Sequence, residues 1–410
     1  MRSIITILFY FLLTSCYGKT IVVGPGHLFV SLKKAIGAAQ ENDTLLVQAG
    51  IYKEGSMLLT KSLVILGQNT PVLDGENKYE ILLISGKNIT IKGFRFHNSG
   101  YSALNDFASI KLINCSRVVL ENNIIENAYF AIHISNSSYV TIRANQIYGK
   151  PTSEQLTGNG IHLWKSTHAL IENNHVQGHR DGIYFEFVTT SLIRNNYSEK
   201  NIRYGLHFMF SNDDSYFGNI FHDNGAGVAV MYSKKVRMEY NKFEQNWGPS
   251  AYGLLLKDIT DSYILHNTFT KNTVALHMEG SSRTAIQKNR FHENGWAIKV
   301  QASCDDNEFS ENNFTGNSFD VGTNGTMMLN KFFNNYWDKY EGYDINKDGI
   351  GDISYHPVSM YSMIIEQNPA TLMLLRSFTV SLLDKAEKAI PGLTPVDLVD
   401  DKPLMKMLKL

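Results

Sequence analysis

Two methionines and one histidine recur at matching positions of a repeated sequence unit and could bind a soft metal ion. Met209 and Met231 are 22 residues apart, and His207 stands two residues before Met209. If each unit forms one coil of a solenoid, the two thioethers lie on neighbouring coils about 5 Å apart. Thioether sulfurs beside an imidazole suit Cu(I) better than Zn(II) or Ca(II). The sequence therefore offers a candidate transient copper site.

The same positions could instead form a docking surface, because aromatic and Met side chains on a surface bind partner proteins without any metal. The strand-like alternation predicts that one column of side chains points outward. The candidate copper or docking face consists of His162, Tyr184, Glu186, His207, Met209 and Met231. Isolated histidines of that column, His133, His162 and His277, are expected to be exposed polar positions. Metal binding and docking both remain open from the residues alone.

An oxygen-rich loop follows the repeats between Asp344 and Asp352. It carries oxygen side chains at positions 1, 3, 5 and 9 and a glycine at position 6, as in a calcium loop, but Tyr355 replaces the bidentate Glu of position 12. The alternative is a turn-rich loop whose side chains satisfy its own backbone. The candidate calcium residues are Asp344, Asn346, Asp348, Ile350 (through its carbonyl) and Asp352.

Carboxylates on the outward face also allow an enzyme. Asp181 and Glu186, with His179 and Arg180 nearby, could serve a polysaccharide lyase, an epimerase or a hydrolase. Scattered charges of this kind occur along any solvated solenoid, so the pair is weak evidence for catalysis. A carbohydrate-active enzyme is the alternative function.

The elements that would position these residues are short strands repeating about every 22 residues. Each unit holds two alternating apolar runs separated by turn residues, which is typical of half-buried strands. One series of asparagines follows the apolar runs: Asn123, Asn145, Asn173, Asn195, Asn219, Asn241, Asn267, Asn289, Asn313 and Asn335. A series of glycine or alanine residues recurs at nearly the same spacing. In both series the spacing increases at Gly149 to Thr157 and at Gly248 to Ala251, which are therefore predicted loops. Stacked coils bury one continuous core. We predict an all-β, right-handed parallel β-helix over residues 93–340, with asparagines stacked at one corner.

The segments around the solenoid differ in composition. Residues 1–18 have the basic and apolar layout of a secretory signal peptide, and Cys16 also fits a lipoprotein cleavage site. Residues 19–92 are predicted to form an N-terminal cap and the first coils, with a capping helix over residues 31–40. Residues 341–368 form the acidic loop that closes the solenoid.

Residues 369–410 are predicted to be an amphipathic helical tail that docks on a membrane complex. Charges interrupt its apolar residues, which argues against a transmembrane span. The candidate docking residues are Leu372, Leu375, Arg376, Leu382 and Leu383.

Composition restricts the partners and the redox chemistry. The net charge is −1, from 38 basic and 39 acidic side chains, so no global field attracts nucleic acid. Apart from Cys16, the two cysteines, Cys115 and Cys304, lie about eight coils apart in the proposed fold, which is too far for a disulfide.

Several strings resemble the NosD family. They are GHRDGIYFEF (178–187), RYGLHFMFS (203–211), GAGVAVMYS (225–233), NYWDKYEGY (335–343), the loop 344–352, and LLRS with PGLTP in the tail. The resemblance implies a periplasmic maturation protein for the copper sites of nitrous-oxide reductase, associated with an inner-membrane complex. It implies as partners the membrane subunit of an ABC transporter and its ATPase, a copper chaperone and the reductase. The chain itself lacks a GxxxxGK[ST] loop, so the ATPase belongs to a partner.

Overall fold

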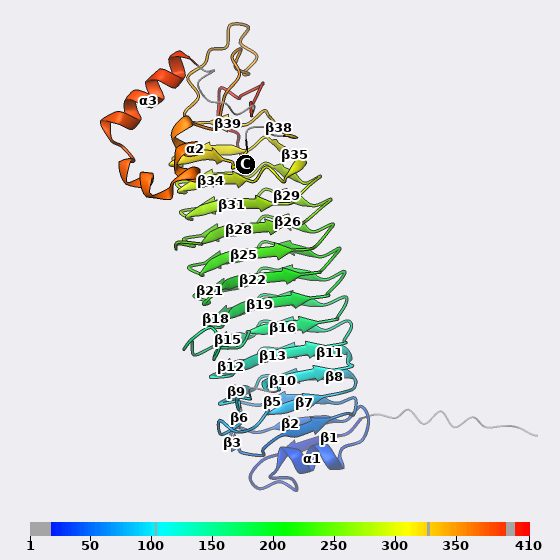
Figure 1. The fold of residues 1–410 in the computed structure, drawn as a ribbon. Helices are drawn as coiled ribbons and strands as arrows, with labels where there is room; N and C mark the ends of the chain where they lie inside the picture. Colours follow the sequence, from blue (N-terminus) through cyan, green and yellow to red (C-terminus); the bar gives the residue numbers. More distant parts are fainter. Residues whose placement is uncertain (1–17, 103–104, 326–328, 391–397) are drawn as a thin grey trace, which may run out of the picture.

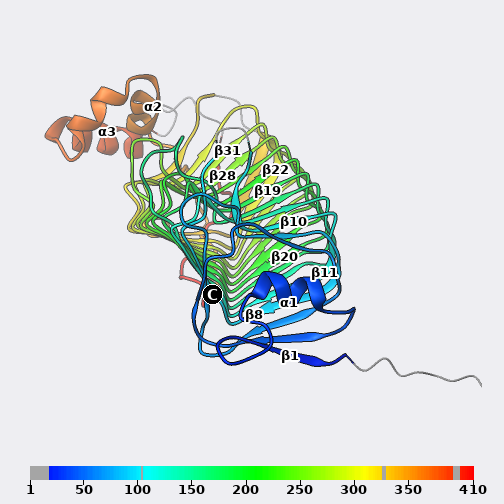
Figure 2. The ribbon, with the colours of Figure 1, turned by 90° about the horizontal axis from the view of Figure 1, so that it is seen from below.

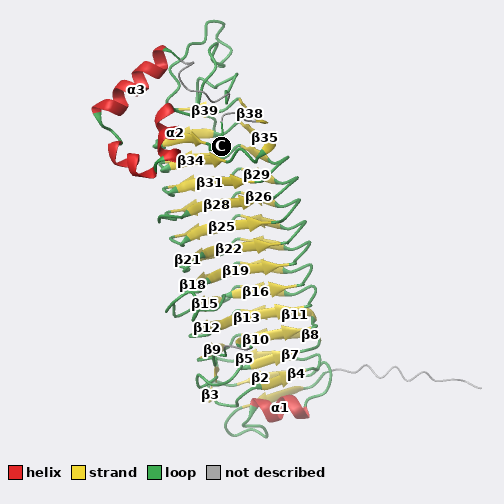
Figure 3. Ribbon diagram, in the orientation of Figure 1, coloured by secondary structure: helices red, strands yellow, loops and turns green. Residues whose placement is uncertain are grey.

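The structure is a computed structural model that describes residues 18–102, 105–325, 329–390 and 398–410. Three parallel sheets wrap around one core to form a parallel β-helix, with helices at its two ends (Figures 1 and 3). The predicted fold class is confirmed. The predicted signal peptide, including Cys16, lies outside the described residues except for Gly18.

Each regular coil contributes one strand to each sheet in the order A, B, C, and every pairing between the described strands is parallel. Sheet A has 14 strands among the described residues: β1 (Thr20–Val23), β2 (Thr44–Val47), β5 (Val64–Gly67), β8 (Lys87–Lys92), β11 (Ser116–Glu121), β14 (Thr141–Arg143), β17 (Leu170–Glu172), β20 (Leu192–Arg194), β23 (Ser215–Phe217), β26 (Arg237–Glu239), β29 (Tyr263–Leu265), β32 (Ala285–Gln287), β35 (Asp305–Ser310) and β38 (Leu329–Phe333). Sheet B has 13 in the same part of the chain: β3 (Ile51–Tyr52), β6 (Val72–Asp74), β9 (Arg95–His97), β12 (Ile124–Glu126), β15 (Gln146–Tyr148), β18 (His175–Gln177), β21 (Tyr197–Glu199), β24 (Ile220–His222), β27 (Lys242–Glu244), β30 (Thr268–Thr270), β33 (Arg290–His292), β36 (Asn313–Thr315) and β39 (Tyr336–Trp337). Sheet C has 12 described strands: β4 (Met57–Leu59), β7 (Leu82–Ile84), β10 (Ala108–Ile113), β13 (Phe130–Ser135), β16 (Ile161–Trp164), β19 (Asp181–Glu186), β22 (Tyr204–Met209), β25 (Ala226–Met231), β28 (Tyr252–Lys257), β31 (Val274–Glu279), β34 (Trp296–Val300) and β37 (Phe319–Gly322).

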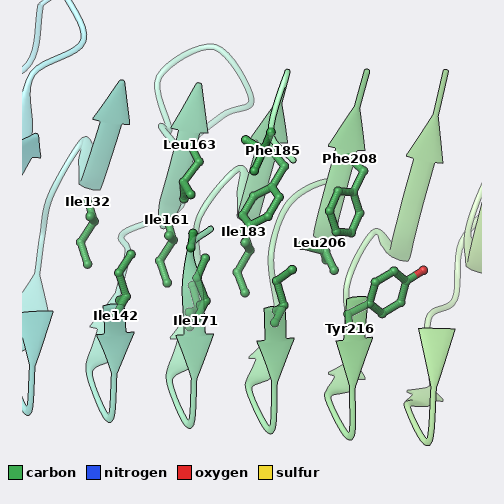
Figure 4. Packing of buried hydrophobic residues seen from close by; sticks show 14 of the residues in the cluster. Ile132, Ile142, Ile161, Leu163, Ile171, Ile183, Phe185, Leu206, Phe208 and Tyr216 are labelled. Carbon is green, nitrogen blue, oxygen red and sulfur yellow. The ribbon is translucent and has the colours of Figure 1, made fainter. Parts of the chain in front are cut away.

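The core is built from inward-facing apolar side chains that stack coil upon coil (Figure 4). Ile161, Ile183 and Leu206 pair in register on adjacent strands of sheet C and are fully buried. Side chains alternate along a strand, so the residue that follows each of these three on its own strand faces outward. This alternation is what places the candidate site on the outer face of sheet C.

Asparagines stack at one corner, as predicted, but the register differs at three Asn-Asn pairs. Asn123 Nδ2 donates to Asn145 Oδ1 at 3.1 Å, and the same contact recurs along the solenoid. At the predicted positions Asn173, Asn195 and Asn313, the neighbouring asparagine occupies the ladder instead. The ladder residues there are Asn174, Asn196 and Asn312. Asn173 and Asn195 hold left-handed turn positions with φ of 55° and 53°, so the next residue is the one that points into the corner.

A second ladder, which the sequence analysis did not identify, runs along another corner. It consists of Asn201, Asn224, Asn246, Asn272, Asn294 and Asn317. Both predicted loops interrupt the coils where expected, between β15 and β16 and between β27 and β28.

A short helix closes the first coil. α1 (Leu32–Ala38) starts at the N-cap Ser31, whose hydroxyl accepts a hydrogen bond from the Lys34 amide. Its buried residues Leu32, Ala35 and Ile36 join the main core, so the helix covers the open end of the sheet stack. The predicted capping helix is confirmed.

The C-terminal segment is divided differently from the prediction. Its helices are α2 (Met360–Gln367), η1 (Pro369–Leu374) and α3 (Phe378–Ala389), so the helical unit begins before Pro369. Residues 398–410 return to the solenoid: Asp400 bridges to Phe332, and Leu404 to Tyr336. The axial view in Figure 2 shows the helices projecting beside the coils. No helix within the described ranges is long and apolar enough to cross a membrane.

One buried carboxyl makes stability depend on pH. Asp214 is fully buried, its Oδ1 accepts from the Ser191 amide at 2.7 Å, and burial raises its pKa to about 8. The unfolded chain releases this proton near pH 3.8, so stability should fall as pH rises from about 4 to 8. We expect Asp214→Asn to be more stable than the wild type at pH 9 by at least about 1 kcal/mol, with no such gain at pH 4. Denaturant unfolding at several pH values measures this, and identical pH profiles would contradict it.

Candidate functional site

The outer face of sheet C carries the predicted column in the predicted register. His133 pairs with His162, His162 with Tyr184, and Tyr184 with His207 on successive strands. In the parallel column two residues further along, Glu186 pairs with Met209 and Met209 with Met231. The two methionines are half-buried on β22 and β25. We call Tyr184, Glu186, His207, Met209 and Met231 the Met face.

His207 is a buried imidazole with free nitrogen atoms. Its side chain is 4% exposed, and neither ring nitrogen has a hydrogen-bond partner among the described residues. Tyr184 lies against it, with ring centroids 4.9 Å apart, and donates its hydroxyl to Met209 Sδ at 3.5 Å. Burial raises the pKa of Tyr184 to about 12, so its hydroxyl stays protonated. The Met face thus joins one imidazole and two thioethers, which are donors that suit Cu(I).

The isolated histidines are less exposed than the sequence analysis expected. His133 is buried, at 6% exposed, and His162 and His277 are half-buried. His133 and His162 lie 4.8 Å apart between ring centroids, and Phe130 packs on both. Burial lowers the pKa of His133 to about 4 and that of His162 well below its usual value. Both rings are therefore neutral at pH 7. The prediction of exposed polar positions is wrong for His133, because aromatic neighbours cover the outer face there.

Two features flank the Met face along the solenoid axis. On one side lies the insertion between β15 and β16, whose Glu154 forms an ion pair with Arg203 of β22's entry turn at 3.4 Å. On the other side, α2 packs on sheet C and pairs Glu366 with Lys299 of β34. An apolar cluster seals that second contact: Val274, Trp296, Phe319, Tyr361, Ile365 and Val380. Sheet C is therefore covered on both sides of the methionine-bearing coils.

A row of exposed aromatics borders the Met face and was missed by the sequence analysis. Phe187, Phe210 and Tyr232 follow Glu186, Met209 and Met231 directly, and they are 45%, 38% and 41% exposed. Their rings stack at 5.1 and 5.0 Å. All three have φ near +50°, a conformation that costs bulky residues energy. The detectable signal was an aromatic residue in a turn where other coils have Lys165, Asp258 or Gly280.

The residues of the enzyme alternative do not form an open acid–base pair. Asp181 and His179 are fully buried, and Arg180 donates to Asn159 Oδ1 at 3.2 Å. Arg180 and Glu186 are partly accessible. The expectation that Asp181 faces solvent is wrong, since neighbouring side chains cover it. A polymer could not reach this carboxylate in the observed structure.

The acidic loop folds on its own side chains. Asp344 accepts from the Asp348 and Gly349 amides at 3.2 and 2.9 Å. Asn346 Oδ1 accepts from Asp348 N at 3.0 Å, and Asp348 Oδ1 accepts from Ile350 N at 2.8 Å. Asp352 Oδ2 accepts from Ile345 N at 2.6 Å, which closes the loop. The side-chain oxygens of Asp344, Asn346, Asp348 and Asp352 thus accept amide hydrogens of their own loop.

Most candidate docking residues of the tail are exposed. Leu372, Leu375 and Leu382 are 46%, 38% and 56% exposed, and Arg376 is exposed beside them. Leu383 differs, because it packs partly buried against the cluster under α2. The helical unit is held to sheet C by one face and leaves the other uncovered. Across the described ranges, no group of three or more His, Cys, Asp or Glu side chains is arranged to hold a metal ion.

Sequence comparisons show which known proteins the chain is similar to. Residues 149–349 match the family model described as "Periplasmic copper-binding protein (NosD)". A protein of Stutzerimonas stutzeri named "Probable ABC transporter binding protein NosD" is 28% identical over 384 residues, covering 88% of this chain and 86% of its own length. The protein of that name from Pseudomonas aeruginosa is 28% identical over 383 residues, with 88% and 87% covered.

The solved structures share the fold alone. The catalytic unit of an α-1,3-glucanase from Streptomyces thermodiastaticus superposes with a TM-score of 0.61 at 13% identity, covering 75% of this chain and 65% of that one. This likeness carries no information about substrate, because one fold hosts many functions. The family-model match instead spans the Met face and the first part of the acidic loop, up to Gly349. The family-model match and the two relatives together support membership of the chain in the NosD family.

Proposed function

We propose that the chain accepts Cu(I) at the Met face and passes it on within a periplasmic complex organised around an ABC transporter. The observation that carries this proposal is the pairing of Met209 with Met231 on adjacent strands, beside an imidazole with unpartnered nitrogens in the described structure. The family is described as periplasmic and copper-binding, and the two relatives are named for an ABC transporter.

The donor set suits a cargo ion rather than a resident one. Two thioethers and one imidazole bind Cu(I) through soft or borderline donors and present no carboxylate cage for Ca(II) or Mg(II). Both methionines are half-buried, so a bound ion stays within reach of another protein's ligands. Tyr184 gives up its contact with Met209 Sδ when the sulfur binds the ion. In this proposal the chain transfers an ion and catalyses no covalent reaction.

We propose a partner for each of the two exposed regions. A copper chaperone delivers Cu(I) to the Met face, and nitrous-oxide reductase receives it. The uncovered face of the helical unit docks on the transporter's membrane subunit, whose ATPase acts on the opposite side of the membrane. The chain is thus a scaffold between transporter, chaperone and reductase.

Copper loading of the reductase tests this function. In a host that makes nitrous-oxide reductase but lacks this chain, the reductase should be recovered depleted in copper. Expression of the wild-type chain should restore its metal content, whereas the Met209→Leu/Met231→Leu variant should not. A fully copper-loaded reductase in the absence of the chain would overturn the proposal.

Removing apolar residues from the helical unit should abolish recovery of the membrane complex. The triple variant Leu372→Ser/Leu375→Ser/Leu382→Ser removes side chains that are exposed, so the fold should persist. We expect the transporter subunits to be lost from affinity purifications out of detergent-treated membranes, because burial of three leucines contributes several kcal/mol to docking.

Leu58 supplies the matched control for this experiment. It is 56% exposed on β4, at the other end of the solenoid. Leu58→Ser should leave recovery of the complex unchanged. Equal recovery with the triple variant and with the wild type would show that another surface docks.

We also propose that the acidic loop binds Ca(II) as a structural ion. Its oxygens accept amide hydrogens of their own loop, and the same oxygens can turn toward a cation. Chelation should lower the melting temperature of the wild type, and added Ca(II) should restore it, because the ion binds only the folded loop. Asp344→Asn/Asp348→Asn should remove this response. A wild type whose melting is insensitive to Ca(II) would leave the self-satisfied loop as the correct description.

A further inference from the structure

Asp181 is a fully buried carboxylate for which the proposed function has no use. Its side chain is 0% exposed at the start of β19, and neither oxygen has a hydrogen-bond donor in the described part of the chain. A carboxylate without hydrogen bonds in such a place is costly, so buried charges are normally paired. The groups that face it therefore explain its presence.

Two groups approach Asp181 from the next coil. Its Oδ2 lies 3.5 Å from His207 Nδ1, and its Oδ1 lies 3.8 Å from Arg203 Nε. Arg203 in turn reaches Glu154 of the insertion loop, at 3.4 Å. The Arg203 side chain is only partly exposed, and it balances the buried negative charge at the carboxylate oxygen that His207 does not approach. One carboxylate oxygen is thereby left to face a single ring nitrogen.

We propose that Asp181 is a positioning residue that accepts the Nδ1–H of His207 and so leaves Nε2 as the nitrogen that binds the cargo ion. A neutral imidazole carries one proton, and the hydrogen bond made by one nitrogen decides which nitrogen keeps a lone pair. Carboxylate–histidine–metal arrangements fix both tautomer and ring orientation in this way. The distance from His207 Nδ1 to Asp181 Oδ2 is 3.5 Å, and shortening it by about 0.5 Å forms the hydrogen bond.

The claim that Nε2 binds the cargo ion rests on the proposed function. The claim that Nδ1 carries the proton does not. Met209 follows His207 by two residues on the same face of β22. Nε2 is the ring nitrogen remote from the backbone, and Nδ1 is directed to Asp181. The assignment therefore specifies which atom of the imidazole acts with the thioethers.

Nitrogen NMR of the histidine rings tests the tautomer in the metal-free protein. The full chain is labelled with 15N at its 13 histidines, and the His207 signals are assigned from a His207→Gln variant. The wild type should show a protonated Nδ1 and an unprotonated Nε2. Asp181→Asn should keep this tautomer, because its amide oxygen still accepts the hydrogen, and Asp181→Leu should lose it.

A second buried aspartate provides the control for folding effects. Asp214 is also fully buried but lies on the inner side of a different turn, so Asp214→Asn should leave the His207 signals unchanged. If Asp181→Leu fails to fold, the wild-type spectrum still decides. A wild-type His207 protonated at Nε2 overturns the proposal.

Ag(I), a redox-inert substitute for Cu(I), tests whether Nε2 of His207 binds the ion. Coupling between silver and Nε2 of His207 is expected in the wild type, with affinity reduced 10- to 100-fold in Asp181→Leu and largely rescued in Asp181→Asn. Coupling to Nδ1 would overturn the role of Asp181 while supporting a metal at His207. Silver binding without any coupling to His207 would overturn the proposed ligand set itself, even if the tautomer is as expected.

Discussion

The double substitution Met209→Leu/Met231→Leu is expected to lower the affinity of the chain for Cu(I) at least about tenfold, or 1.4 kcal/mol. Leucine keeps nearly the same volume and apolar character, so the change removes two sulfurs and little packing. The two residues pair directly on β22 and β25, where both thioethers can reach one ion. Competition with a chromophoric Cu(I) chelator measures the affinity. Each single variant should lose part of this effect.

Two core methionines separate ligand loss from a general effect of replacing methionine. Met238 and Met278 are fully buried and point into the solenoid. Met238→Leu and Met278→Leu should therefore bind Cu(I) as the wild type does. Unchanged affinity in the Met209/Met231 double variant would leave the docking surface as the role of the Met face.

The register of the Met face could be predicted because it follows from two periodicities. Side chains alternate along a strand, and parallel coils of equal length place identical positions above one another. The 22-residue step between Met209 and Met231 therefore already implied the observed pairing. His207 was placed correctly for the same reason, as were Tyr184 and Glu186.

Burial on the outer face could not be predicted from the same periodicities. His133 and Asp181 point out of the solenoid, yet both are covered. Their covering comes from Phe130 at a coil entrance, from the turn that carries Arg203, and from neighbouring rings. These contacts depend on insertions and corners that occur once, so no repeat reveals them. The sequence shows which face a residue takes but not what lies over it.

The asparagine ladder could likewise be predicted only to within one residue. An Asn-Asn pair can supply either residue to the ladder, and the choice depends on which one takes the left-handed turn. Asn173 takes it and Asn174 enters the ladder, a difference of one position that composition does not resolve. The final segment had no repeat signal at all, since residues 398–410 pair with coils more than 60 residues earlier.

That final segment ends the main asparagine ladder with a carboxylate. Asp400 is fully buried, and its Oδ2 accepts from Asn335 N at 3.2 Å, from Asn335 Nδ2 at 3.0 Å and from Trp337 Nε1 at 3.0 Å. Its Oδ1 accepts from the Lys402 amide at 3.1 Å. Asp400 thus takes the position that the next asparagine would occupy. It satisfies donors that the last coil would otherwise leave buried without partners.

Asp400→Ala is expected to destabilise the C-terminal coils by about 3 kcal/mol, because the Asn335 amide and the Trp337 indole lose their acceptor. Denaturant unfolding followed by Trp fluorescence measures the loss, and hydrogen exchange should localise it to β38 and β39. Asp400→Asn should lose less, since burial raises the pKa of Asp400 and an amide avoids the cost of a buried charge. The neighbouring exposed Asp401 is the control, and Asp401→Ala should change stability by less than about 0.5 kcal/mol. Equal losses from Asp400→Ala and Asp401→Ala would mean that the backbone pairing of Asp400 with Tyr355, and not its carboxylate, holds this end of the solenoid closed.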